Sequence, residues 1–218
     1  MDAKYYIETD GDIFLVRREG ALDLPFKREV PFEFDPIAPL PVDGEVWFCS
    51  PRLAEHPSDW TGKDHVDGLD DVTPLVREAV HASMPRVVVE GVCVQQGCVL
   101  LVKGNRGFTK DRWTLPGGFL RFGEDPTEGL QREIREEIGV DCRIGDLIAV
   151  RSKLGKASRL HWILFFYRIA IDGEPIANPD EIAELRFVEV DEACGLLADG
   201  VMREVVSKLG RAPKTDGH

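Results

Sequence analysis

The sequence predicts an α+β protein, with a mixed β-sheet held between helices as an α/β/α sandwich and a small β-rich unit in front of it. Two observations lead to this fold class. Short runs rich in β-branched and aromatic residues recur along the chain and outnumber the helical patterns. Strands and two principal helices also follow one another in a mixed order rather than in regular alternation, which favours α+β over a purely parallel sheet.

The N-terminal part, residues 1–70, is expected to be a small β unit that ends in a linker. Its runs "KYYIET" and "DIFLVRR" flank an Asp-Gly dipeptide that suits a tight hairpin turn. The later stretch "SPRLAEHPSDWTGKDHVDGLDD" is rich in Pro, Gly and Asp, as linkers and long loops are. Thr73 as an N-cap and Pro74 at the first helical position then predict a connecting helix over residues 71–84.

Residues 85–212 are expected to form the second, larger domain. The β-branched runs "RVVVEGVCVQ" and "CVLLVKG" are separated by Gln-Gly, which predicts a central hairpin. A loop leads to "TLPGG" and to a helix over residues 125–138. Strands are expected in "CRIGDLIAVRSKL", "LHWILFFYRIAI" and "LRFVEV", and helices in "DEACGLLA" and "VMREVVSKLG". The polar residues 213–218 are expected to form a flexible tail.

The composition restricts the partners and the compartment that we expect. The chain has 39 acidic residues against 27 Lys and Arg, and its formal charge of -12 repels nucleic acid and anionic membranes, so neither is an expected partner. The N-terminus lacks the basic and apolar segments of a signal peptide, and no run reaches membrane-spanning length. Five cysteines without CxxC spacing fit a reducing compartment, so we expect a cytoplasmic protein.

The helix at residues 125–138 carries the densest group of carboxylates. Its apolar residues recur every four positions and give one stripe that can dock on a sheet, while Glu133, Glu136 and Glu137 lie together beside that stripe. Like charges at this spacing destabilise a helix by a few tenths of a kcal/mol per pair. A divalent cation such as Mg²⁺, which takes oxygen ligands, would compensate; the alternative is a solvated acidic face.

The flanking residues favour the cation. Pro116-Gly117-Gly118 provides a backbone without bulky side chains that can approach a ligand closely. Arg132 lies beside the carboxylates, where its fixed charge can orient a glutamate, and Gly139 ends the helix as a C-cap.

With its spacing, this segment resembles the signature of the Nudix hydrolases at every fixed position. The matching residues are Gly118, Glu124, Arg132, Glu133, Ile134, Glu136, Glu137, Gly139 and Val140. The flanking "WTLPGG" and "NPDEIAELRFVEVDE" also look like that family, whereas the N-terminal region lies outside the resemblance.

The resemblance implies a Nudix-type sandwich fold and Mg²⁺- or Mn²⁺-assisted hydrolysis of a nucleoside diphosphate linked to another moiety. It further implies catalytic or metal-binding roles for residues of the signature and for a later loop acid. Glu133, Glu136, Glu137 and the carbonyl of Gly117 resemble the metal ligands, and Arg132 with Glu124 resembles the pair that braces loop and helix. The general base could come from the signature or from the later loop, where Glu181 is the expected residue, chosen over Asp180 and Glu184; the alternative for Glu181 is an ordinary loop acid.

Residues outside the signature are weaker candidates for substrate binding. Arg112, Arg159 and His161 are the ones that we expect to reach phosphates or a ribose, although each alone also fits a solvated surface. Four aromatic residues could stack on a base or belong to the core. They are Trp113, Phe119, Phe122 and Trp162.

ADP-ribose or a related nucleotide sugar is the favoured substrate. Two alternatives stay open: a hydrolase of non-standard nucleoside triphosphates, and a non-catalytic protein that senses nucleotides. Residues 1–70 are a candidate for a homodimer interface or for shaping the substrate pocket.

Overall fold

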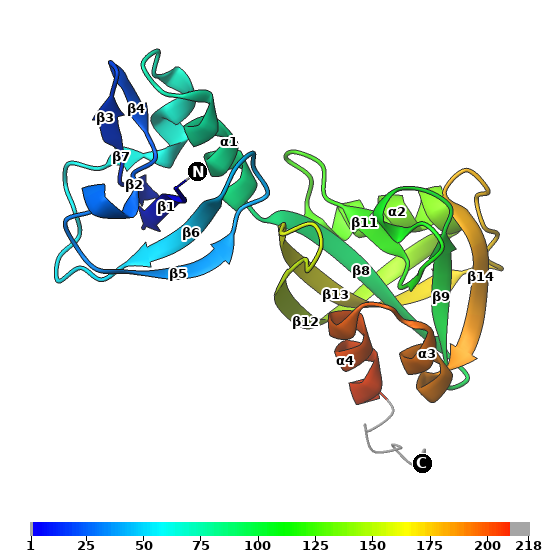
Figure 1. Cartoon of the computed structure of the whole chain (residues 1–218). Helices are drawn as coiled ribbons and strands as arrows, with labels where there is room; N and C mark the ends of the chain where they lie inside the picture. Colours follow the sequence, from blue (N-terminus) through cyan, green and yellow to red (C-terminus); the bar gives the residue numbers. More distant parts are fainter. Residues whose placement is uncertain (1, 210–218) are drawn as a thin grey trace. The chain divides into compact units, whose positions relative to one another are not determined.

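The computed structural model describes residues 2–209, so the predicted tail at 213–218 and the last residues of the predicted 85–212 domain lie outside the described residues. Two compact units make up the chain, as the ribbon in Figure 1 shows. Of the described residues, the first unit contains residues 2–85 together with Leu154–His161, and the second contains Arg86–Lys153 and residues 162–209.

The first unit is built on a five-stranded sheet in the order β5-β6-β1-β2-β7. Strand β1 runs parallel to β6, and the other neighbours are antiparallel. The strands are β1 (Lys4–Thr9), β2 (Asp12–Ile13), β5 (Phe34–Pro39), β6 (Val46–Pro51) and β7 (Thr61–Gly62). A separate ladder joins β3 (Val16–Arg18) and β4 (Ala21–Asp23), and two 3-10 turns are η1 (Lys27–Glu29) and η2 (Lys63–Gly68).

The predicted hairpin at Asp10-Gly11 is confirmed. Strands β1 and β2 pair across it, with φ of 49° at Asp10 and 88° at Gly11. The run "DIFLVRR" is not one strand, however, because its first residues pair with β1 while its last residues form β3 and pair with β4. The continuous apolar run Ile-Phe-Leu-Val in the sequence hid this change of partner.

The helix predicted at residues 71–84 is present as α1 (Pro74–Ser83), but it packs into the core of the first unit. Val76, Ala79 and Val80 lie in that core together with Val66 of the predicted linker. Thr73 occupies the N-cap position, yet its hydroxyl donates to Asp23 rather than to the helix, at 3.1 Å. The Pro- and Gly-rich composition therefore marked turns within a packed unit.

The second unit is built on a seven-stranded mixed sheet. Its main path runs β10-β9-β8-β13-β12, with β11 added to β8 and β14 added to β9. Strand β13 is parallel to β8, and β8 and β9 form the predicted hairpin. The strands are β8 (Arg86–Gln95), β9 (Cys98–Gly104), β10 (Trp113–Thr114), β11 (Gly117–Phe119), β12 (Asp141–Leu154), β13 (His161–Asp172) and β14 (Ile182–Glu189); a 3-10 turn, η3, spans Gly107–Thr109.

Helices cover both faces of this sheet, which confirms the predicted sandwich (Figure 1). On one face, α2 (Pro126–Ile138) buries its apolar stripe of Leu130, Ile134 and Ile138 against the sheet. On the other face lie α3 (Val190–Leu196) and α4 (Gly200–Leu209). Alternate residues of β8 face opposite layers, because successive side chains of a strand point to opposite sides.

Both ends of α2 have the local chemistry that fixes them. Asp125 is the N-cap and accepts from the Thr127 N–H at 2.9 Å, and Pro126 occupies the first helical turn. Gly139 closes the helix with φ of 69°, as predicted. These caps therefore set where α2 begins and ends.

Candidate active site

Two glycines allow the backbone of β11 to lie against the acidic helix. Gly117 has φ of 148°, and a Cβ there would collide with the carbonyl oxygen of Val89. At Gly118 a Cβ would lie 2.5 Å from Cδ of Glu133. The Gly117 N–H donates to Oε2 of Glu137 at 3.0 Å. These residues therefore bring a side-chain-free backbone and two helix carboxylates together.

Arg132 is the centre of the charged network on α2. Its guanidinium grips Glu124 with two parallel hydrogen bonds, at 2.7 and 2.8 Å. Its Nη1 donates to Glu133 at 2.6 Å and to Glu136 at 3.0 Å, and Nη2 donates to the Phe119 carbonyl at 3.0 Å. Arginine suits this position because its planar fork supplies several donors at fixed angles. The predicted bracing of loop and helix by Arg132 and Glu124 is thus present.

The carboxyl groups differ in their electrostatic surroundings. Hydrogen bonds from Arg132 lower the pKa of Glu124 to about 2. Burial raises the pKa of Glu137 to about 8, and the nearby charges of Glu133 and Glu181 add to that shift. Burial also raises the pKa of Glu133, against the opposing effect of Arg132. Burial and neighbouring like charges therefore oppose ionisation of Glu133 and Glu137, and a bound cation would favour their ionised form.

The chemistry of these groups fits a divalent cation. Carboxylate oxygens and a backbone carbonyl are ligands that Mg²⁺ prefers. Within residues 2–209, no three acidic, imidazole or thiol groups are gathered closely enough to ligate a metal as they stand. The reason is that Glu133 and Glu136 turn toward Arg132, while Glu137 accepts from Gly117. Rotation of these flexible side chains would be needed to bind a cation, and the metal-ligand assignment stays a prediction.

Glu181 lies in a loop that is tied to the end of α2. Asn178 donates from its side chain to the Glu136 carbonyl at 3.0 Å and from its backbone to the Glu137 carbonyl at 2.8 Å. The Glu181 side chain is 26% exposed and forms an ion pair with Arg106. Its charge contributes to the raised pKa of Glu137, so the two carboxyl groups lie within electrostatic range. The role of general base remains a prediction.

The three predicted substrate-binding residues fall in different parts of the chain. Arg112 is exposed in the loop before β10 of the second unit. Arg159 and His161 belong to the segment Leu154–His161, which groups with the first unit. Arg159 has φ of 56° and donates to the Leu40 carbonyl within that unit, at 3.5 Å. Their substrate contacts stay predictions.

The aromatic candidates separate clearly in the structure. Trp162 contacts Phe108 and Phe119 with ring centroids 5.5 Å apart in each pair, although Phe108 is 61% and Phe119 is 46% exposed. Trp113 instead packs on the core beneath Arg186, and Phe122 is fully exposed. An exposed aromatic patch therefore surrounds Trp162.

Three residues beside the site escaped prediction from the sequence: Glu90, Asn178 and Arg106. Glu90 lies on β8 opposite Gly117 and is only 4% exposed, and burial raises its pKa well above the usual value. An acidic residue inside the apolar run "RVVVEGVCVQ" was a signal in itself, because a charged residue is rarely fully buried without a partner. Asn178 and Arg106 gave no such signal.

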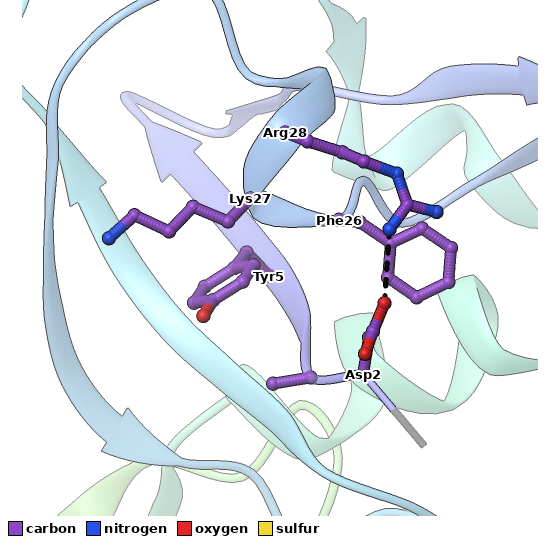
Figure 2. A pocket seen from close by; sticks show the side chains of 6 residues that line it. Asp2, Tyr5, Phe26, Lys27 and Arg28 are labelled. Atoms are coloured by element: carbon purple, nitrogen blue, oxygen red, sulfur yellow. Dashed lines mark hydrogen bonds and ion pairs between the residues drawn. The ribbon is translucent and has the colours of Figure 1, made fainter.

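The first unit also has a hollow, of about 250 Å³, which Figure 2 shows. Its charges are largely satisfied locally: Arg28 pairs with Asp2 at 3.0 Å and lies over the Phe26 ring at 4.8 Å. The lining residues are Asp2, Ala3, Tyr5, Phe26, Lys27 and Arg28. These contacts explain how η1 is held against β1, and they leave the acidic helix as the stronger candidate site.

Comparison with known proteins agrees with the fold of the second unit. The family model of the NUDIX domain matches residues 83–209, so the chain belongs to the Nudix family, and its second unit is a Nudix pyrophosphohydrolase domain. A crystal structure of the MutT NUDIX hydrolase from Burkholderia pseudomallei is 28% identical, with a TM-score of 0.51. The likeness covers 58% of this chain and 98% of that one.

Two curated relatives each match about half of the chain. An ADP-ribose pyrophosphatase of Methanocaldococcus jannaschii is 30% identical over 115 residues, which is 53% of this chain and 68% of the relative. The nucleoside triphosphatase NudI of Salmonella paratyphi B is 30% identical over 118 residues, covering 49% of this chain and 84% of the relative. Across the described residues, no helix is both long and apolar enough to cross a membrane.

Proposed function

We propose that this protein hydrolyses the pyrophosphate bond of a nucleoside diphosphate linked to another moiety, with ADP-ribose or a nucleotide sugar as the favoured substrate. The observation that carries this proposal is the placement of Glu133, Glu136 and Glu137 on one helix beside Gly117 and Gly118. The printed name of the Methanocaldococcus jannaschii relative supports the choice of substrate.

Each residue of the site has a role in the proposed reaction. When bound, Mg²⁺ or Mn²⁺ would neutralise phosphate oxygens and lower the pKa of a water molecule. Glu133, Glu136, Glu137 and the carbonyl of Gly117 would hold the cation. Arg132 orients Glu133 and Glu136 through the hydrogen bonds that it donates to them.

The proton and the substrate are assigned to residues outside the helix. Glu181 would accept the proton of the attacking water, from a loop that Asn178 fixes to α2. Arg112, Arg159 and His161 would contact the phosphates or a ribose, since the substrate is an anion and the chain is acidic. A nucleotide-derived small molecule is thus the expected partner.

A second candidate function is hydrolysis of non-standard nucleoside triphosphates, which the name of the NudI relative favours. A non-catalytic nucleotide sensor is a third, but such a protein would not need to keep every carboxylate of the signature. We also propose that residues 1–70 support a homodimer or shape the pocket, and light scattering on the full chain would test the oligomeric state. A cytoplasmic location remains a proposal.

Product identification tests the function. The purified chain would be incubated with Mg²⁺ or Mn²⁺ and one candidate substrate at a time: ADP-ribose, other nucleotide sugars, NADH, dinucleoside polyphosphates or nucleoside triphosphates. The products would be separated by chromatography and identified by mass spectrometry. Cleavage of ADP-ribose to AMP and ribose phosphate, abolished by EDTA, is the expected result. Cleavage of triphosphates alone would establish the second candidate, and silence across the panel would favour the sensor.

A further inference from the structure

Glu90 on β8 is a buried carboxyl group with one unpartnered oxygen. Glu90 is 4% exposed, and its Oε2 accepts no hydrogen bond among the described residues. A buried polar group without a partner costs about 1–3 kcal/mol. Lys153, whose charge acts on Glu90 and lowers its pKa, is bound to Asp199 instead. The protein itself therefore leaves an acceptor open at this point of the sheet.

Strand register places the Glu90 side chain on the same face of the sheet as the aromatic patch around Trp162. Val88 and Val92, two residues away on either side, belong to the core layer under α3 and α4, so Glu90 faces that layer too. Phe119 is registered with Val88, and Trp162 with Arg86. Lys153, which is within electrostatic range of Glu90, also lies 6.0 Å from the Trp162 ring.

The order of these groups along the strands follows the order of groups in a nucleotide. Glu90 is registered with Gly117, whose N–H donates to Glu137, and the charge of Glu137 helps to raise the pKa of Glu90, so Glu90 lies within electrostatic range of the proposed site of pyrophosphate cleavage. At about 3.3 Å per residue, the Phe119 position is about 7 Å further along the strand and the Trp162 position about 13 Å. In a nucleotide, the ribose comes next to the phosphate and the base lies beyond the ribose.

We propose that Glu90 is a specificity-determining residue that accepts a hydrogen bond from a ribose hydroxyl of the substrate, while the base stacks on the exposed rings of Phe119 and Trp162. This inference rests on the proposed function for the direction of the nucleotide. A carboxyl oxygen accepts hydrogen bonds in either protonation state, and a hydroxyl is the donor that a ribose offers. Stacking on aromatic rings is available to every base.

Binding of AMP, 2′-deoxy-AMP and 3′-deoxy-AMP to the full chain tests the inference without requiring turnover. Calorimetry on the unmodified protein should show about 10-fold to 100-fold weaker binding of the analogue that lacks the contacted hydroxyl. Glu90→Leu should bind AMP and that analogue equally. Glu90→Gln should keep part of the discrimination, because an amide oxygen still accepts. Glu128→Gln, an exposed position on α2, is the matched control and should discriminate as the unmodified protein does.

Three results would overturn the proposal. One is no discrimination against any deoxy analogue by the unmodified protein. Another is that Glu90→Leu loses affinity equally for the ligands with ribose and for those with deoxyribose. The third is that Glu90→Leu binds Mn²⁺ alone more weakly but still discriminates between AMP and its deoxy analogues, which would make Glu90 a metal ligand.

A protein that discriminates between AMP analogues but cleaves no substrate would support this inference and contradict the proposed function.

Discussion

Replacing Arg132 by lysine should destabilise the second unit far more than a charge-conserving change suggests. The guanidinium donates five hydrogen bonds, to Glu124, Glu133, Glu136 and the Phe119 carbonyl. An ammonium group offers its donors from one point and cannot reproduce the paired bonds to Glu124. The side chains of Arg132 and Glu124 are only 15% and 14% exposed, so solvent screens these bonds weakly.

The magnitude follows from the bonds that are lost. Each charge-assisted hydrogen bond contributes about 1.5–3 kcal/mol, so losing the equivalent of one or two should cost about 3 kcal/mol. For a unit of this size, that corresponds to a fall in Tm of roughly 10 °C. Arg135→Lys is the matched control on the same helix, because its ion pair with Asp141 joins side chains that are 56% and 70% exposed. Arg135→Lys should lower the free energy of unfolding by less than about 1 kcal/mol.

Calorimetry on the full chain measures the transition of the second unit, and hydrogen exchange of residues 117–138 shows whether the loss is centred on β11 and α2. Equal shifts for Arg132→Lys and Arg135→Lys would refute the reasoning. Loss of protection spread evenly over the sheet would refute it too, since the guanidinium contacts only the end of β11, the loop that follows it and α2.

Three further predictions concern backbone, loop and acid stability. Gly118→Ala should lower turnover at least about 10-fold with little change in Tm, because the added Cβ displaces only the flexible end of the Glu133 side chain. Gly117→Ala should instead unfold the unit, because the added Cβ collides with backbone atoms. Similar Tm values for the two variants would contradict this. Asn178→Ala should reduce kcat while the affinity for Mn²⁺ is kept, and an unchanged kcat would show that the loop needs no tie. In the first unit, burial opposes ionisation of Asp23, but hydrogen bonds from Lys4 and Leu24 outweigh it and lower the pKa. The stability from Asp23 is therefore present above its ordinary pKa, near 4, and is lost as pH falls through the lower folded value. Urea unfolding between pH 2 and 6 should lose this part of its pH dependence in Asp23→Asn, and an identical slope would contradict the assignment.

The sequence predicted those parts of the site that are local. Asp125, Pro126 and Gly139 define the ends of α2 through short-range capping, and the spacing of Glu133 and Glu137 follows from helical geometry alone. Arg132 could be expected beside Glu133 and Glu136 for the same reason. Its grip on Glu124 was implied by the resemblance to the Nudix signature rather than by spacing.

Long-range partners were beyond the sequence. Nothing in "DIFLVRR" shows that its two ends enter different sheets, and nothing around Thr73 shows that its hydroxyl leaves the helix for Asp23. The exposure of Phe119 and the packing of Trp113 likewise depend on which strands become neighbours. Each of these features depends on how strands distant in the sequence pair with one another, which sequence patterns alone do not determine.

The central claim is that the carboxylates of α2 support hydrolysis, and turnover by Glu137→Gln tests it most directly. ADP-ribose cleavage at saturating Mg²⁺ would be compared between the unmodified chain, Glu137→Gln and the exposed control Glu128→Gln, with Tm measured for each. We predict a fall in kcat of about 100-fold or more for Glu137→Gln alone, without loss of Tm, because a metal ligand is removed and like-charge repulsion is relieved. Undiminished turnover by Glu137→Gln in Mg²⁺ would contradict the assignment of this helix as the catalytic centre.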